Sequence, residues 1–230
     1  MTSDVPVNSR REIKFVTGEH EGGRLVSWLR LHSAGFRAPF PTRWINSIYF
    51  DSYDFSAYRQ NLAGASERTK VRYRWYGPDI SPGPGTLEVK CKRNYFGWKL
   101  RYPVPRLVHA QKYRWRDLLA QMMDQLPPDG RIWLRSNPQP AIMVRYRRSY
   151  FETADGRMRA TIDERQSIYD QRYKPYLNLT SRSNICQTAV FELKFDRSAR
   201  ETAAHILSGI PVRVSRNSKY VEGLRSVHRF

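Results

Sequence analysis

The sequence of 230 residues is poor in cysteine and in acidic residues, and it contains no long apolar run. Its two cysteines, Cys91 and Cys186, are far apart, which excludes a disulfide scaffold and a cysteine-based zinc site and favours a reducing compartment. No apolar stretch approaches the roughly 18 residues of a membrane span, and the N-terminus lacks a signal-peptide core. We therefore expect a cytoplasmic protein without a transmembrane segment. The GxxxxGK[ST] pattern is also missing, which excludes a P-loop nucleotide site.

Positive charge is the dominant feature of the composition. Lys and Arg total 40 against 21 Asp and Glu, so the formal net charge is +19 and the isoelectric point is about 10.3. Such an excess indicates a polyanionic partner, which could be a nucleic acid, a phosphate-rich molecule or polymer, or an anionic membrane surface. Hydrophobic residues make up 40% of the chain, enough for a folded core.

Period-2 alternation of apolar and polar side chains dominates between short Gly- and Pro-rich loops. It predicts strands over residues 11–16, 44–51, 68–76, 85–92, 97–104, 142–152, 158–163, 166–173 and 188–195. Helical spacing predicts helices within 19–32 and 110–126 and from 218 onward. These elements predict an α+β, mostly antiparallel β fold, closed into a barrel because closure removes exposed strand edges. We expect a flexible N-terminus over 1–9 and a single domain over 10–230.

Long charged side chains repeat on one parity of six predicted strands. For one strand alone, a solvated face would be the simpler interpretation, but a solvated face mixes signs and these faces are mainly cationic. Side by side, such faces repel one another unless an anion lies between them. If this parity faces inward, the barrel becomes a cationic tunnel suited to a chain of phosphates. The side chains concerned are Glu12, Lys14, Lys70, Arg72, Arg74, Glu88, Lys90, Lys92, Arg145, Arg147, Arg157, Arg159, Thr161, Asp163, Glu192 and Lys194.

Carboxylates on the same parity indicate a divalent cation. Alone they would repel phosphate, whereas a bound metal ion would bridge them to phosphate oxygens. For Glu12 and Glu88, a cross-strand ion pair with lysine is an equally good interpretation. For Glu192, which lies in the otherwise apolar strand AVFELKF, metal ligation is favoured.

Eight stretches of the sequence together resemble the VTC domain. This is the polyphosphate-polymerase-type branch of the triphosphate tunnel metalloenzymes, also called the CYTH-like superfamily. The stretches are RREIKF, SIYFDSYDFSAYRQNLAG, ERTKVRYRWYG, TLEVKCKRNYFGWKLRYPV, VRYRRSYF, MRATID, VFELKF and VSRNSKYVEG, in order over residues 10–223. The resemblance implies a closed eight-stranded antiparallel tunnel with peripheral helices, whose inward Arg and Lys bind a triphosphate and whose acids bind Mg²⁺ or Mn²⁺.

One position departs from the wider superfamily. Its first strand opens with ExExK, whereas here Arg10 replaces the first acid and only Glu12 and Lys14 remain. This change is similar to the VTC branch. It favours a one-metal site, and polyphosphate synthesis over simple hydrolysis.

The pattern and the resemblance together assign candidate roles. The phosphate-binding candidates are Lys14, Lys70, Arg72, Arg74, Lys90, Arg145, Arg147, Arg159, Lys194, Ser218 and Lys219. The catalytic candidates are Arg72, Arg74, Lys90, Arg147 and Glu192, and the metal candidates are Glu192, Glu88 and Glu12, for Mn²⁺ or Mg²⁺. Ser218 and Lys219 are included because they fall at a predicted helix N-terminus, which attracts anions; a solvated Lys219 is the alternative.

The function expected is metal-dependent phosphoryl transfer on ATP, triphosphate or polyphosphate, with ATP-dependent polyphosphate synthesis favoured. A triphosphatase and a non-catalytic polyphosphate- or nucleotide-binding domain stay open as alternatives. A nucleic-acid-binding sheet fits poorly, because its aromatic and cationic side chains would share one exposed face, and here they alternate. We therefore expect no DNA or RNA partner, and the sequence leaves the oligomeric state open.

Overall fold

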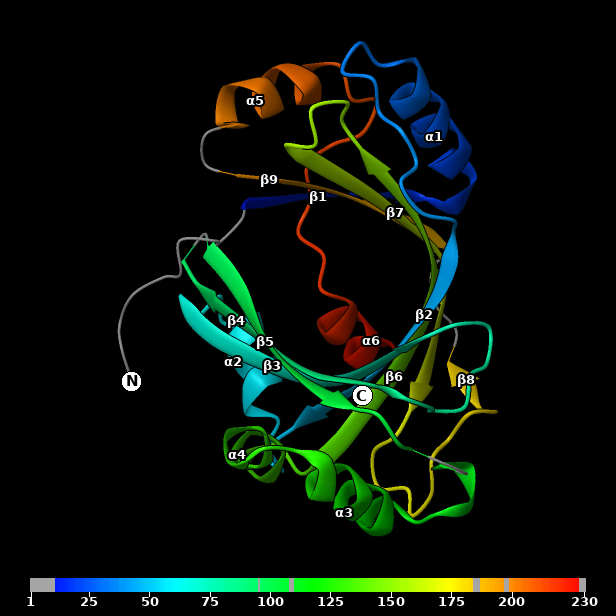
Figure 1. The fold of residues 1–230 in the computed structure, drawn as a ribbon, viewed down its shortest axis with the longest axis vertical. Coiled ribbons are helices and arrows are strands. Elements are labelled where there is room, and N and C mark those ends of the chain that lie inside the picture. The colour runs from blue at the N-terminus through cyan, green and yellow to red at the C-terminus, as the bar shows by residue number, and fades with distance from the viewer. Residues whose placement is uncertain (1–10, 95, 108–109, 184–186, 197–198, 228–230) are drawn as a thin grey trace.

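The computed structural model of the protein describes residues 11–94, 96–107, 110–183, 187–196 and 199–227. The predicted flexible segment 1–9, Arg10 and Cys186 lie outside these residues. Nine strands form one mixed-length antiparallel sheet that curves around a hollow, with helices on its outside and one helix within it (Figure 1). The predicted class, mostly antiparallel β with peripheral helices, is confirmed.

The strands follow the predicted alternation closely. They are β1 (Arg11–Gly18), β2 (Arg43–Asp51), β3 (Glu67–Tyr76), β4 (Gly85–Arg93), β5 (Phe96–Val104), β6 (Gln139–Glu152), β7 (Met158–Asp170), β8 (Arg182–Ser183) and β9 (Thr188–Phe195). The sheet order is β1-β9-β7-β6-β2-β3-β4-β5, with β8 beside β7. The two strands predicted over 158–163 and 166–173 are one strand, β7. Its pairing with β6 shifts register near Arg165, which has a φ of 52°.

The sheet is an open half-barrel, so the predicted closed eight-stranded tunnel is wrong. β1 and β5 stand at the two ends of the strand order and do not pair, and the eight strands turn through only 199°. The C-terminal chain covers the free edge of β1 instead. Phe15 forms a bridge with Val214, and the Ser215 amide donates to the Lys14 carbonyl at 2.8 Å. Backbone groups at this edge thus find partners without barrel closure.

Four helices cover the outer face of the sheet in two pairs (Figure 1). Residues of α1 (Gly22–Leu31) and α5 (Arg200–Ser208) pack with outward side chains of β1, β7 and β9. Residues of α3 (Trp115–Gln125) and α4 (Pro128–Ser136) pack on β3, β4 and β5, where Tyr73 and Trp75 are buried. Burial of each such large apolar side chain contributes about 1.5–3 kcal/mol. The outward parity of these strands therefore holds the core, which leaves the inward parity for polar groups.

Helix α6 (Lys219–Val227) lies in the hollow of the sheet, next to α2 (Ser56–Leu62) (Figure 1). Its Tyr220 and Leu224 join an apolar cluster with inward side chains of β2 and β6. Gly223 permits this approach, since a Cβ there would lie 2.5 Å from Cδ1 of Ile142. α6 thus fills one part of the hollow and presents its N-terminus to the rest. None of the helices in the described residues is long and apolar enough to cross a membrane.

Candidate functional site

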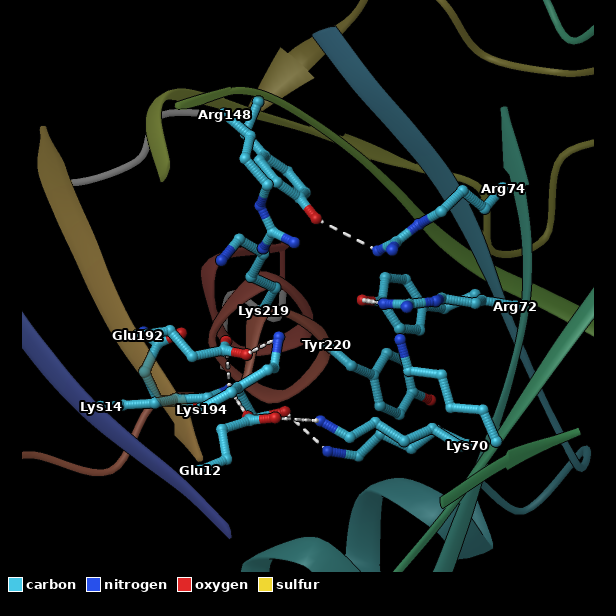
Figure 2. A pocket seen from close by; sticks show the side chains of 16 residues that line it. Glu12, Lys14, Lys70, Arg72, Arg74, Arg148, Glu192, Lys194, Lys219 and Tyr220 are labelled. Carbon is cyan, nitrogen blue, oxygen red and sulfur yellow. Dashed lines mark hydrogen bonds and ion pairs between the residues drawn. The ribbon is translucent and has the colours of Figure 1, made fainter. Parts of the chain in front are cut away.

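A polar cavity of about 80 Å³ lies in the hollow of the sheet, beside the N-terminus of α6 (Figure 2). It opens into a wider groove of about 2000 Å³. Two carboxylates, Glu12 and Glu192, line the cavity. Nine cations line it with them: Lys14, Lys70, Arg72, Arg74, Lys90, Lys99, Arg148, Lys194 and Lys219. The cavity is therefore strongly electropositive.

Strand alternation and register bring these cations together. Side chains two residues apart on a strand share a face, so β3 directs Lys70, Arg72 and Arg74 inward. Across the sheet Lys70 pairs with Lys90, and Lys90 pairs with Lys99. Like charges in opposed positions destabilise a sheet. This row of lysines therefore indicates a site that is completed by an anion.

Glu88 orients the arginines on one wall. Arg72 donates from Nε to Glu88 at 2.9 Å and from Nη1 to the Tyr49 hydroxyl at 3.2 Å. Arg74 Nη1 lies 3.8 Å from the same carboxylate, and its Nη2 donates to the Tyr146 hydroxyl at 3.1 Å. Burial would raise the pKa of Glu88, but Arg72 and Arg74 hold it well below its usual range. Both guanidinium groups are thus fixed in place before any ligand arrives.

The opposite wall holds a cluster of two carboxylates and their lysines (Figure 2). Lys14 Nζ lies 2.9 Å from Glu12 and 3.6 Å from Glu192, and Lys194 forms an ion pair with Glu192. Lys90 reaches Glu12 from β4 at 3.4 Å. Burial would raise the pKa of Glu192, but Lys194 and Lys14 keep it well below its usual range. Burial would raise the pKa of Glu12 as well, but Lys90 and Lys14 lower it to about 2, so both carboxylates are ionised at neutral pH.

A third cluster joins β6, β7 and α6. Asp163, fully buried, accepts from Arg148 at 2.5 and 2.7 Å and from Lys219 at 2.6 Å. Burial would raise the pKa of Asp163, but Arg148 and Lys219 lower it to about 2. This carboxylate offsets the unfavourable position of a lysine at a helix N-terminus. The side chains of Arg148 and Lys219 are thereby held at the cavity.

Two lysines of the cavity lose their charge easily. Burial, together with the nearby Lys90 and Lys14, lowers the pKa of Lys70 to about 6. Burial and the nearby Arg72 lower the pKa of Lys99 to about 6 as well. A bound anion would favour the protonated form of both side chains.

The structure brings most of the predicted residues together. Glu12, Lys14, Lys70, Arg72, Arg74, Lys90, Glu192, Lys194, Ser218 and Lys219 all line the cavity. Glu88 lies directly behind Arg72. Arg159 instead lines the wider groove, where it is exposed and pairs with Glu152 at 3.2 Å.

Arg145 and Arg147 do not share this cavity, contrary to the prediction. Arg145 stacks over Trp44 at 4.4 Å and donates to the Pro78 carbonyl at 2.7 Å, while Arg147 is exposed and lies opposite Glu164. The side chains of β6 that face inward at this point are those of Tyr146 and Arg148, which are two residues apart. The stretch VRYRRSYF has arginines on both parities, and the prediction chose the wrong one.

Sequence reasoning also missed other residues that line the cavity. These are Tyr49, Lys99, Tyr146, Arg148, Asn217 and Tyr220. Lys99 could have been found, because it alternates with Trp98 and Leu100 as the other cations alternate with apolar residues. For Tyr49 and Tyr220 there was no signal, since a buried tyrosine in an apolar segment usually belongs to the core.

The carboxylates permit a cation site smaller than the predicted one. Among the described residues, no group of three or more His, Cys, Asp or Glu side chains could hold a metal ion, so Glu88 does not join Glu12 and Glu192. These two carboxylates nevertheless converge on one positive charge, the ammonium of Lys14. The Asn217 carbonyl accepts from the same ammonium at 3.2 Å. These oxygens therefore surround one ammonium group, and the metal site stays a prediction.

Comparison with known proteins gives one family and several related folds. The model of the VTC domain family matches residues 9–228. No curated protein sequence matches the chain.

Three solved structures are similar over most of their length. A Hippeastrum protein named as an adenylyl cyclase, with a dominant triphosphatase activity, is 15% identical over 96% of this chain and 97% of that chain, with a TM-score of 0.49. A Pyrococcus horikoshii protein is 12% identical over 95% and 99% of the two chains, with a TM-score of 0.51. A chain of the Schizosaccharomyces pombe Mediator head module is 8% identical over 90% and 97%, with a TM-score of 0.50. At these identities the likeness concerns the fold alone.

Proposed function

The chain belongs to the VTC domain family, and on this premise we propose that it transfers phosphoryl groups on a triphosphate or polyphosphate held in the cationic cavity. The favoured reaction is polyphosphate synthesis from ATP. The observation that carries the proposal is the convergence of nine cations from six strands and α6 on one small cavity. Such a site suits a ligand with several negative charges in a row, and phosphates match the geometry of arginine.

The arginines supply the electrostatic part of catalysis. Phosphoryl transfer depends mainly on in-line positioning and on neutralising charge on the equatorial oxygens. Arg72, Arg74 and Arg148 are held by Glu88, Tyr146 and Asp163, so little reorganisation is needed when charge develops. We assign these three residues to the transferring phosphoryl group and its neighbour.

The lysines and the N-terminus of α6 bind the rest of the chain of phosphates. Lys14, Lys70, Lys90, Lys99 and Lys194 line the same cavity on the β1, β3, β4, β5 and β9 side. Ser218 directly precedes α6, and its hydroxyl accepts from Lys70 at 2.8 Å and from the Val221 amide at 3.3 Å. A helix N-terminus next to lysines is a favourable anion site. This arrangement supports binding of more than one phosphate group.

Glu12 and Glu192 are the candidate ligands of a divalent cation, Mn²⁺ or Mg²⁺. When bound, such an ion would neutralise charge on the transferring phosphoryl group. Lys14 now holds the position on which these carboxylates converge. We propose that phosphate draws Lys14 away from the carboxylates, so that the cation and the triphosphate bind together.

A binding function without turnover is favoured by one observation. Each of the four carboxylates in or behind the cavity, Glu12, Glu88, Asp163 and Glu192, is already paired with at least two cations. If none is released by the ligand, the cavity would bind polyphosphate or nucleotide and leave it intact.

One experiment separates these functions. The purified protein is incubated with ATP and Mn²⁺ or Mg²⁺, and products are resolved by gel electrophoresis and by assay of free phosphate. Long phosphate chains support the synthase, and free phosphate without chains supports a triphosphatase. Binding of ATP without turnover supports the binding function, and absence of binding contradicts all three. Arg72→Ala serves as the control variant, because it removes a central cation of the cavity.

A further inference from the structure

Four side chains form an exposed aromatic cluster that the proposed chemistry does not use. The guanidinium of Arg43, at the start of β2, lies 4.8 Å from the ring centres of Tyr76 and Tyr150 and 5.8 Å from that of Phe40. Its Nε also donates to the Tyr150 hydroxyl at 3.0 Å. Phe40 meets Tyr150 edge to face at 5.9 Å. We call these four residues the mouth cluster.

The mouth cluster continues two rows of side chains that begin in the cavity. On β3, Tyr76 follows Arg74 on the same face, and on β6, Tyr150 follows Arg148. Two residues along a strand span about 6.6 Å. Arg43 is the register partner of Arg148, so it lies beside the same row. In both rows, an aromatic ring is thus the first group beyond the last arginine of the cavity.

The mouth cluster is also continuous with the open part of the site. Arg148 lines both the cavity and the wider groove, and Phe40 and Tyr150 line that groove. Large parts of two rings face solvent, since Phe40 is 55% exposed and Tyr76 is 50% exposed. A contiguous group of exposed rings marks an interaction site or a ligand-binding groove.

We infer that the mouth cluster stacks on the nucleobase of a nucleoside triphosphate whose phosphates occupy the cavity. The inference rests on the proposed function. If the α-phosphate binds Arg74 or Arg148, the ribose spans the distance from that arginine to the aromatic residue two positions further along the strand. The base then reaches the rings of the mouth cluster. Aromatic rings and a guanidinium stack on any base, because every base has a π face. The ligand class is therefore nucleoside triphosphates with little preference between ATP and GTP.

The test compares two ligands in matched variants. Titration calorimetry measures the affinities of ATP and of inorganic tripolyphosphate for the wild-type protein, for Phe40→Ala combined with Tyr76→Ala, and for Tyr53→Ala. Tyr53 is 77% exposed and lines neither the cavity nor the groove, so it serves as the control. Loss of base stacking in the double variant should lower the affinity for ATP by about fivefold to a hundredfold. Tripolyphosphate should bind the double variant as it binds the wild type, which also verifies that the variant is folded.

Each outcome decides the matter. An affinity for ATP that is unchanged in the double variant would overturn the mouth cluster as a base site while leaving the phosphate site intact. Affinities for ATP and tripolyphosphate that fall by the same factor would also overturn it, because the loss would then concern the phosphates and not the base. A wild-type protein that binds neither ligand would overturn the proposed function, and the base site with it. The site would be established if the double variant bound ATP more weakly but tripolyphosphate with unchanged affinity, and if Tyr53→Ala bound both ligands as the wild type does.

Discussion

The ammonium of Lys70 donates a hydrogen bond to the Ser218 hydroxyl at 2.8 Å, and this contact joins β3 to the N-terminus of α6. Among the described residues, Lys70 has no carboxylate within ion-pair distance, although Lys14, Lys90 and Lys194 all have one. The cavity thus contains a half-buried lysine without a carboxylate partner, whose charge a bound anion would balance.

Binding of tripolyphosphate should take up protons at about pH 7.5, because the pKa of Lys70 and that of Lys99 are lowered to about 6 in the free protein. The anion raises both pKa values, so both side chains bind protons as the complex forms. Affinity should therefore fall as pH rises above 6. Calorimetry in buffers of different ionisation enthalpy measures the number of protons.

The variant Lys70→Met separates the protein's protons from those of the ligand. It should reduce the uptake by about one proton at the same pH. Equal uptake by the variant and the wild type would show that Lys70 is already charged in the free protein.

Removing a cation should change stability in opposite directions at two positions. Lys70→Met removes a half-buried ammonium that has no carboxylate partner, and it should raise the free energy of unfolding by about 1 kcal/mol or more. The pKa of Lys70 is depressed in the folded protein, so the unfolded wild-type chain binds more protons. The stability gained by Lys70→Met should therefore grow as pH falls from about 10.4 to about 6.

Arg72→Met leaves Glu88 without its main partner and should lower the free energy of unfolding by about 3 kcal/mol. Denaturant unfolding at several pH values measures both changes; a loss of stability in both variants would contradict the assignment of Lys70.

Alternation along β3 was enough to predict the face of each side chain. Tyr73 and Trp75 are buried in the core between the sheet and the helices on its outer face. Arg72 and Arg74, on the opposite parity, therefore point into the hollow. The same logic placed Glu192 correctly in β9.

Features that depend on tertiary contacts could not be predicted in this way. The pattern of apolar residues does not indicate whether the two edge strands pair with each other. Here the edge of β1 is covered by the chain at Val214 and not by β5. The sequence pattern predicted no helix between 126 and 218, yet Pro128 begins α4, because proline fits the first turn of a helix. Alternation with Tyr146 favoured Arg147 over Arg148, because an aromatic residue is expected to face the core, but Tyr146 itself faces inward and lines the cavity with Arg148.

The two adjacent arginines of β6 should differ strongly in their effect on binding. Arg148→Met removes a cation from the cavity. It should weaken the binding of tripolyphosphate by about 1.5–3 kcal/mol, a roughly tenfold to hundredfold loss of affinity. Arg147→Met, on the exposed face, should change the affinity by no more than about twofold, the effect of a screened surface charge. Calorimetry on both variants measures the contrast. A greater loss in Arg147→Met would restore the parity predicted from the sequence.

The role of Glu192 is decided by a substitution that keeps its shape and removes its charge. Glu192 forms ion pairs with Lys14 and Lys194, and it shares Lys14 with Glu12. If it only balances these lysines, Glu192→Gln should strengthen anion binding and leave turnover of ATP nearly intact.

If Glu192 instead holds the divalent cation, Glu192→Gln should lower metal-dependent turnover at least a hundredfold, in line with the several kcal/mol that a catalytic cation contributes to the transition state. Binding of tripolyphosphate without metal should persist or tighten, because the freed Lys14 and Lys194 then serve the phosphates. We expect this second result. Lys194→Met is the matched control: it removes the cation beside the same carboxylate, so it should weaken metal-free binding while metal-dependent turnover at saturating ATP persists. Turnover that survives in Glu192→Gln would reduce this residue to an ion-pair partner of the lysines.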